Sequence, residues 1–349
     1  MLQFGVIGCG YIAKKHINTI SQFHDMSLIA VSDINQQKME EVTKDYDENP
    51  ISFYQDYKYM LADPRVDVVV IATISSLHAE MAKNALNNHK HVIIEKPLAL
   101  SLTDANEIIY LAQKHQKHVL VCHQLRYRPI IKKIKELITK GYFGEIHFGA
   151  ITLMLNRSPE YYREASWKGT WEHDGGMLIN QGIHLVDLLI WMMGDIQSVY
   201  GEIATTFERK QTEDIALGMI NFENGAKGLI NANTITKPEN IGYYFSLFGE
   251  KGSIRIGGKK FNQIKHCYIE DLPDIKKELA SLCSDLDEHV FMYKNFYESI
   301  TNGKKVLMSA KEGKKALEGI FSLYQSSKSN QPVYLPIENF STTDMLKDN

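Results

Sequence analysis

The chain has 349 residues, 44% of them hydrophobic and 23% charged, which suits two globular domains of ordinary size. Its formal net charge of −3 gives no electrostatic reason to expect a nucleic acid or an anionic membrane as partner. The four cysteines form no Cys-x-x-Cys pair, so we expect reduced thiols and no metal. The first apolar run starts at residue 2, so we expect no signal peptide. No apolar stretch approaches the ~20 residues that cross a bilayer, and we therefore expect a cytoplasmic protein.

The first apolar run, Leu2–Ile7, leads directly into a glycine-rich turn that ends at Ala13 and is followed by a helical pattern. Gly8 permits a tight turn, Gly10 lets a pyrophosphate approach bare backbone, and Ala13 lets the helix pack closely on the strand. The start of the helix offers free amide donors to phosphates. A turn of this kind that binds nothing is the alternative. The predicted cofactor-binding residues here are Gly8, Gly10, Tyr11 and Ile12.

Asp33 stands twenty residues after Ala13, at the end of the second apolar run, Leu28–Ser32. A carboxylate at this place accepts hydrogen bonds from the adenosine ribose and repels a 2′-phosphate. The sequence therefore predicts NAD rather than NADP as the cofactor.

Short apolar runs alternate with helical patterns through residues 1–123, which predicts a Rossmann domain with a doubly wound parallel sheet. The runs are Leu2–Ile7, Leu28–Ser32, Val66–Ala72, His91–Ile94 and His118–Cys122, with helical patterns at Leu77–Asn87 and Thr103–Gln116. Ligands bind such a sheet outside the carboxyl ends of its strands. Thr73 and Glu95 follow two of the runs, so we expect both to bind the cofactor.

The pattern changes after residue 124, where long alternating runs predict an α+β domain built on a large, mainly antiparallel open sheet. The runs are Ile146–Leu155, Val199–Phe207, Ile215–Phe222, Gly225–Ile235 and Tyr243–Phe248, and the helical patterns are Pro129–Lys140, Met177–Met193, Asp285–Thr301 and Ser309–Ser326. We assign residues 124–335 to substrate binding and oligomerisation and residues 336–349 to a polar, frayed tail. Because too few helices follow the strands to cover both faces of the sheet, we expect a homodimer or homotetramer.

Glu95-Lys96-Pro97 follows a predicted strand at the cofactor edge of the sheet. A lysine that is partly desolvated there has a lowered pKa, which suits a proton shuttle, and Pro97 fixes the local backbone. A solvated surface Glu–Lys pair is the alternative. We predict that Lys96 is catalytic and contacts both cofactor and substrate.

A predicted helix carries Asn180, His184 and Asp187 at spacings of four and three, which place them on one face. His184 can hydrogen-bond a substrate hydroxyl and exchange its proton near neutral pH, and Asn180 can orient a sugar hydroxyl. The alternatives are a core histidine at 184 and, at Asp187, either orientation of the imidazole or a plain structural role.

These motifs, in this order along nearly the whole chain, resemble the glucose–fructose oxidoreductase / inositol dehydrogenase family (Gfo/Idh/MocA). The resemblance implies NAD(P)-dependent oxidation of a secondary hydroxyl on a sugar or cyclitol, with Lys96 beside the reacting hydroxyl and His184 as acid/base. Residues 72–78 are similar to the family's loop beneath the cofactor, although Ile74-Ser75 replaces the common Pro-Asn. We therefore expect His78 to cap that loop. Trp167-Lys168-Gly169 is similar to a Trp-Arg-Gly stretch near the nicotinamide, so the resemblance implies that Trp167 and Lys168, like His78, bind the cofactor.

Asn180 stands where many family members carry Asp, so Lys96 and His184 must share the proton transfer. The Asn-Gln-Gly-Ile-His pattern is similar to members that act on sugars or sugar nucleotides, including those that oxidise C3 of UDP-N-acetylglucosamine or its uronate. The stretch before the helix supplies cations for a diphosphate and rings for a base or sugar, namely Arg157, Tyr161, Tyr162, Arg163, Trp167 and Lys168. We predict that Arg157 and Tyr162 bind substrate; a solvated basic loop is the alternative.

The sequence thus predicts an NAD-dependent dehydrogenase of a sugar, with a nucleotide-linked sugar preferred over a free sugar or cyclitol. Two other functions stay open: an NAD-binding redox regulator without catalysis, and a glycosidase that works through transient oxidation and keeps NAD bound. The presence of both Lys96 and His184 favours catalysis, because a sensor does not need two groups that handle protons.

Overall fold

A computed structural model describes residues 1–46, 50–207 and 210–346. The chain divides into two compact units, which we call the first unit (Met1–Gln124 with Asp287–Lys314) and the second unit (Leu125–Leu286 with Lys315–Asn349). The predicted second domain, 124–335, therefore contributes residues 287–314 to the first unit.

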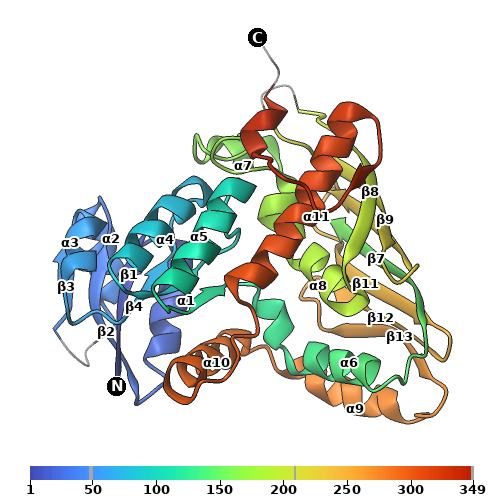
Figure 1. Ribbon diagram of the computed structural model, residues 1–349, viewed down its shortest axis with the longest axis horizontal. Helices are drawn as coiled ribbons and strands as arrows, with labels where there is room; N and C mark the ends of the chain where they lie inside the picture. Colours follow the sequence, from blue (N-terminus) through green and yellow to red (C-terminus); the bar gives the residue numbers. More distant parts are fainter. Residues whose placement is uncertain (47–49, 208–209, 347–349) are drawn as a thin grey trace. The chain divides into compact units, whose positions relative to one another are not determined.

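The first unit holds a six-stranded parallel sheet in the order β3-β2-β1-β4-β5-β6, which confirms the predicted Rossmann fold (Figure 1). The strands are β1 (Leu2–Ile7), β2 (Met26–Ser32), β3 (Ser52–Tyr54), β4 (Val68–Ile71), β5 (His91–Ile94) and β6 (Val119–Val121). β3 was not predicted, because its three partly exposed residues form no apolar run. The strand order reverses between β1 and β4, where doubly wound sheets bind their ligands.

Helices cover both faces of this sheet. They are α1 (Tyr11–Ile20), α2 (Gln36–Thr43), α3 (Tyr57–Ala62), α4 (His78–Asn87), α5 (Leu102–Lys114) and α10 (Glu288–Asn302). α1 contacts α2 and α10, whereas α4 contacts α3 and α5. Because parallel crossovers are right-handed and the strand order reverses, these two groups lie on opposite faces. All four residues of β4 are buried, as a strand covered on both faces requires.

The second unit is built on an eight-stranded sheet in the order β13-β12-β11-β7-β10-β9-β8-β14. The strands are β7 (Ile146–Met154), β8 (Ile196–Ala204), β9 (Ile215–Phe222), β10 (Lys227–Asn233), β11 (Gly242–Gly249), β12 (Gly252–Gly258), β13 (Gln263–Ile269) and β14 (Val333–Tyr334). Neighbours are antiparallel except β7 and β10, which confirms the predicted, mainly antiparallel sheet. β12, β13 and β14 were not predicted: β12 alternates over only four residues between glycines, β13 is mostly exposed and β14 has two residues.

One face of this sheet is covered by two helices, α8 (Ile183–Met193) and α11 (Ala310–Ser329). A Cβ on Gly149 of β7 would lie 2.9 Å from Leu189 of α8, and one on Gly218 of β9 would lie 2.6 Å from Leu323 of α11. Glycine in these strands therefore lets the helices approach closely. The remaining helices are α6 (Pro129–Thr139), α7 (Pro159–Arg163) and α9 (Ile275–Ser281). Within the described residues, no helix combines the length and hydropathy that a membrane crossing requires.

The opposite face of the sheet exposes large apolar side chains. Leu217 and Met219 of β9 are 49% and 58% exposed, and Leu229 of β10, the cross-strand partner of Met219, is 40% exposed. The predicted oligomer is the arrangement that would cover this face, and it stays a prediction.

The predicted frayed tail after Pro336 is corrected by the structure over residues 337–346. Ile337 and Phe340 are buried, and the Phe340 ring lies 5.1 Å from that of Phe321 in α11. The buried Thr342 hydroxyl donates a hydrogen bond of 2.6 Å to the Trp171 carbonyl. Two apolar side chains in a polar stretch are enough to hold this segment on the second unit.

Candidate active site

The glycine turn of the first unit leaves room for a pyrophosphate at the start of α1. Gly8 has φ +90°, and a Cβ there would lie 2.7 Å from the Ala72 carbonyl oxygen. Gly10 begins α1 with no side-chain cap, and a Cβ on it would meet no atom within 4 Å. Tyr11 is exposed and Ile12 half-buried in the first turn, which carries no acidic residue. The start of α1 therefore has open space at Gly10, where a phosphate can approach the backbone.

Asp33 holds its carboxylate against the same turn. Its Oδ2 accepts a hydrogen bond of 2.8 Å from the Cys9 amide and its Oδ1 one of 2.9 Å from the Asn35 amide. The next residue, Ile34, is 92% exposed and offers no cation to a 2′-phosphate. This donor and acceptor set fits the adenosine ribose of NAD.

Two loops of the first unit are tied together by His78. Its Nδ1 lies 2.7 Å from the Pro97 carbonyl oxygen, and its Nε2 lies 3.2 Å from that of Thr73. Burial lowers the pKa of His78, so the ring is neutral and donates to one carbonyl, which we assign to Pro97 on the shorter distance. The cap predicted at His78 thus holds the backbone directly after Lys96, while Thr73 packs against Gly8.

Glu95 is engaged from two sides at the end of β5. Its Oε1 accepts a hydrogen bond of 3.0 Å from Nε2 of His16, and its Oε2 one of 3.2 Å from the Lys96 amide. Burial raises the pKa of Glu95, but the His16 hydrogen bond and the His16 and Lys96 charges outweigh it and bring the pKa to about 2. An ionised carboxylate therefore lies beside the half-buried Lys96.

Sequence reasoning missed His16 and Tyr293, which extend this network. His16 lies on the buried face of α1, and its Nδ1 is 2.8 Å from the Tyr293 hydroxyl of α10. A polar residue at the buried period of a helix was the available signal. His16, Glu95 and Cys122 bring potential metal ligands within 4.8 Å of one another, but burial raises the pKa of the Cys122 thiol well above its usual value, which disfavours the thiolate that binds metal.

In the second unit, Asn180 lies in a π-helical turn, Leu178–Gly182, that leads into α8. The predicted continuous α-helix Met177–Met193 is corrected accordingly, because a π turn places residues four apart at a different angle. His184 follows in the first turn of α8, and both side chains are half-buried. Single π turns inside helices are frequent at functional sites.

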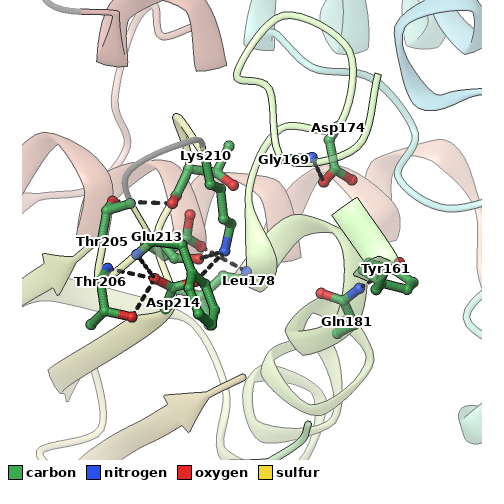
Figure 2. A network of polar contacts seen from close by, with 12 residues as sticks. Tyr161, Gly169, Asp174, Leu178, Gln181, Thr205, Thr206, Lys210, Glu213 and Asp214 are labelled. Atoms are coloured by element: carbon green, nitrogen blue, oxygen red, sulfur yellow. Dashed lines mark hydrogen bonds and ion pairs between the residues drawn. The ribbon is translucent and has the colours of Figure 1, made fainter. Parts of the chain in front are cut away.

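Asp174 fixes the orientation of Asn180. The buried Asp174 accepts a hydrogen bond from the Asn180 amide nitrogen at Oδ1. Its Oδ2 accepts one of 2.8 Å from the Gly169 amide (Figure 2). A carboxylate only accepts hydrogen bonds, so the amide nitrogen of Asn180 faces Asp174 and its carbonyl oxygen points the other way. Position 180 therefore presents an acceptor, with a carboxylate directly behind it.

Asp187 forms a bidentate ion pair with Arg126. The two hydrogen bonds are 2.8 and 2.7 Å long, and both side chains are 1% exposed. Burial raises the pKa of Asp187, against the Arg126 and His184 charges that lower it. Both oxygens of the Asp187 carboxylate thus accept hydrogen bonds from Arg126, a residue that the sequence analysis did not single out. The orientation of His184 by Asp187 stays a prediction.

The basic and aromatic residues before the π turn form a cluster in the second unit. Lys168 lies 4.0 Å from the centre of the Tyr161 ring and pairs with Glu164, and Arg157 lies 5.1 Å from the same ring. The side chain of Lys168 is 14% exposed, so this lysine is largely shielded from solvent. The other predicted members differ in exposure: Trp167 and Tyr162 are half-buried, and Arg163 is exposed.

Comparisons with known proteins agree with these features. Residues 2–123 match the model of the oxidoreductase family with the NAD-binding Rossmann fold, and residues 131–255 match the GFO/IDH/MocA C-terminal domain. The oxidoreductase YrbE of Bacillus subtilis is 30% identical over 71% of this chain and 72% of its own. Myo-inositol 2-dehydrogenase of Thermotoga maritima is 25% identical over 90% and 93%.

Two solved structures are similar over 97% of this chain. The WlbA dehydrogenase of Bordetella pertussis, in complex with NADH and UDP-GlcNAcA, has a TM-score of 0.89 at 29% identity and 98% coverage of its own chain. The WlbA dehydrogenase of Chromobacterium violaceum, with the same ligands, has a TM-score of 0.90 at 30% identity and 96% coverage. Together with the open glycine turn and the Asp33 carboxylate, these matches establish that the chain belongs to the GFO/IDH/MocA family and is an oxidoreductase with NAD as its cofactor.

Proposed function

We propose that this oxidoreductase oxidises a secondary hydroxyl of a nucleotide-linked sugar, at C3 of UDP-N-acetylglucosamine or its uronate. The observation that carries the proposal is the cluster of Arg157 and Lys168 around Tyr161. Cations of this kind suit a diphosphate, and the ring suits a base or sugar face. The two WlbA dehydrogenases crystallised with NADH and UDP-GlcNAcA support it, because they match nearly the whole chain.

The chemistry is assigned to Lys96 and His184. When bound, NAD accepts the hydride that leaves the hydroxyl-bearing carbon. One of the two side chains takes the hydroxyl proton, and the Lys96 ammonium stabilises the negative charge that develops on the oxygen. Glu95 keeps a negative charge beside the Lys96 backbone through this change, because its pKa of about 2 leaves it ionised at neutral pH.

Asn180 is assigned to substrate orientation. With its amide nitrogen held by Asp174, its carbonyl oxygen accepts a hydrogen bond from a sugar hydroxyl. This role needs a donor on the substrate, which both a sugar and a cyclitol supply.

A free sugar or cyclitol is the second candidate substrate. The inositol dehydrogenases of Thermotoga maritima and Bacillus subtilis are 25% and 26% identical over 90% and 97% of this chain. A cyclitol carries no diphosphate, so it would leave Arg157 and Lys168 without a role in binding.

The test is NADH formation from UDP-N-acetylglucosamine, its uronate, free N-acetylglucosamine and myo-inositol. We expect the UDP-sugars to be oxidised with release of NADH and Lys168→Met to raise their KM about tenfold, since a charged hydrogen bond to phosphate is worth that much. Lys140→Met, at the exposed lysine that caps the carboxyl end of α6, is the matched control and should leave KM unchanged. Oxidation of the free sugar or cyclitol alone would refute the nucleotide-sugar substrate, and redox-neutral turnover would indicate the glycosidase reaction.

A further inference from the structure

A buried carboxyl group lies under the π turn that carries Asn180. Glu213 is fully buried in the loop before β9, and its Oε1 accepts a hydrogen bond of 2.8 Å from the Leu178 amide (Figure 2). The same oxygen accepts a hydrogen bond of 2.6 Å from the Tyr324 hydroxyl. Gly176 has φ +107°, and a Cβ there would lie 2.5 Å from Glu213 Oε2. Any side chain at position 176 would clash with the Glu213 carboxyl group, so glycine is required where that group packs against the start of the turn.

The loop that holds Glu213 is itself fixed by an ion pair. Lys210 Nζ donates hydrogen bonds of 2.6 Å to the Glu213 carbonyl and to Asp214 Oδ1, and the second oxygen of Asp214 accepts from the Thr206 hydroxyl at 2.9 Å (Figure 2). Lys210 and Asp214 are almost completely buried. The carboxyl group of Glu213 therefore meets the Leu178 amide from a rigid support.

The hydrogen bond between Glu213 and the Leu178 amide is stronger when Glu213 is ionised, even though burial makes the folded state as a whole favour the neutral form. Hydrogen bonds to a carboxylate are stronger than those to a neutral carboxyl group, and a negative charge is favourable at the amino end of a helical segment. Leu178 is the first residue of that segment, two positions before Asn180 and six before His184. A weaker bond at Leu178 therefore loosens the backbone from which both side chains extend.

We propose that Glu213 is a positioning residue of the proposed reaction, which holds the first turn of the segment carrying Asn180 and His184 and releases it on protonation. Its effect on turnover rests on the proposed function, whereas its hold on the Leu178 amide does not.

The groups that face Glu213 place this switch near neutral pH. Burial raises the pKa of Glu213 to about 7, against the Tyr324 hydrogen bond, the Leu178 amide and the Lys210 charge, which lower it. The pKa of Tyr324, which donates to Glu213, is raised by burial, by Glu213 and by the charge of Asp174. Both forms of Glu213 are thus populated around pH 7.

The experiment compares wild type with Glu213→Gln, a neutral residue of the same shape, from pH 5.5 to 8.5. Hydrogen exchange of peptides covering residues 175–186 is measured without substrate, and kcat is measured with the best sugar substrate. We expect Glu213→Gln to match wild type at pH 5.5 and, at pH 8.5, to exchange faster and turn over about fivefold more slowly. Glu223→Gln, at an exposed glutamate of the β9–β10 turn, is the control and should follow wild type throughout.

Tyr324→Phe supplies a second test that does not depend on the glutamine variant folding. Loss of the tyrosine hydrogen bond raises the pKa of Glu213, so the midpoint of the exchange and kcat transitions should move to higher pH. An unmoved midpoint, or equal pH profiles of Glu213→Gln and wild type, would overturn the proposal. Normal exchange behaviour without activity on any sugar would instead refute the proposed function alone.

Discussion

Replacing Glu213 by glutamine should change how the stability of the second unit depends on pH. The folded state raises the pKa of this carboxyl group from its ordinary 4.5 to about 7, chiefly by burial. Each pKa unit corresponds to about 1.4 kcal/mol, so the rise amounts to about 3 kcal/mol between the two protonation states. Between pH 4.5 and 7 the folded protein retains a proton that the unfolded chain has lost, so this contribution to stability disappears as the pH rises.

Glu213→Gln has no such proton. Its free energy of unfolding relative to wild type should therefore increase between pH 4.5 and 7 and level off above pH 7, about 3 kcal/mol higher than at pH 4.5. Urea unfolding followed by tryptophan fluorescence is a suitable assay, because all three tryptophans, Trp167, Trp171 and Trp191, belong to the second unit. A difference between the two proteins that does not vary with pH would refute the reasoning.

Three further predictions concern the rest of the molecule. Lys96→Ala should lower kcat by roughly 10²–10⁴ while NAD binding, measured by titration, survives; Lys96→Arg should restore little, since a guanidinium cannot shuttle a proton. Wild type should prefer NAD to NADP in kcat/KM, and Asp33→Ala should narrow the gap; equal use of NADP by wild type would contradict the role of Asp33. Light scattering at micromolar concentration should give a dimer or tetramer, and Met219→Lys, on the exposed face of the sheet, should shift it towards monomer; a wild-type monomer would contradict this.

The sequence predicted those parts of the structure in which a periodic pattern coincides with burial. Buried strands such as β1 and β4 form nearly continuous apolar runs, and β9 alternates with its two faces. The glycine turn was predictable because its backbone requires glycine at a tight turn. Asp33 was predictable because its negative charge suits the ribose hydroxyls of NAD. β13 was missed because it lies at the edge of its sheet, where only Ile269 among its residues is buried and most side chains are unconstrained.

Residues whose role depends on distant partners could not be predicted. Glu213 meets Leu178 and Tyr324, which lie 35 and 111 positions away in the sequence. Arg126 is likewise identified only by its pairing with Asp187, 61 positions later. The π turn leaves no periodic signal either, because it adds a single residue to a helical segment and its sequence, Leu-Ile-Asn-Gln-Gly, shows no period of its own.

The polar groups of the second unit carry information about function because they oppose stability. A buried carboxyl group with a pKa near 7 costs stability wherever it is ionised, and an apolar side chain in that space would avoid the cost. Asp174 and Asp187 are also buried, and both contact the segment that bears Asn180 and His184 or belong to it. These groups are unfavourable for folding, yet they converge on one segment. We therefore infer that they fix the position of that segment rather than stabilise the fold.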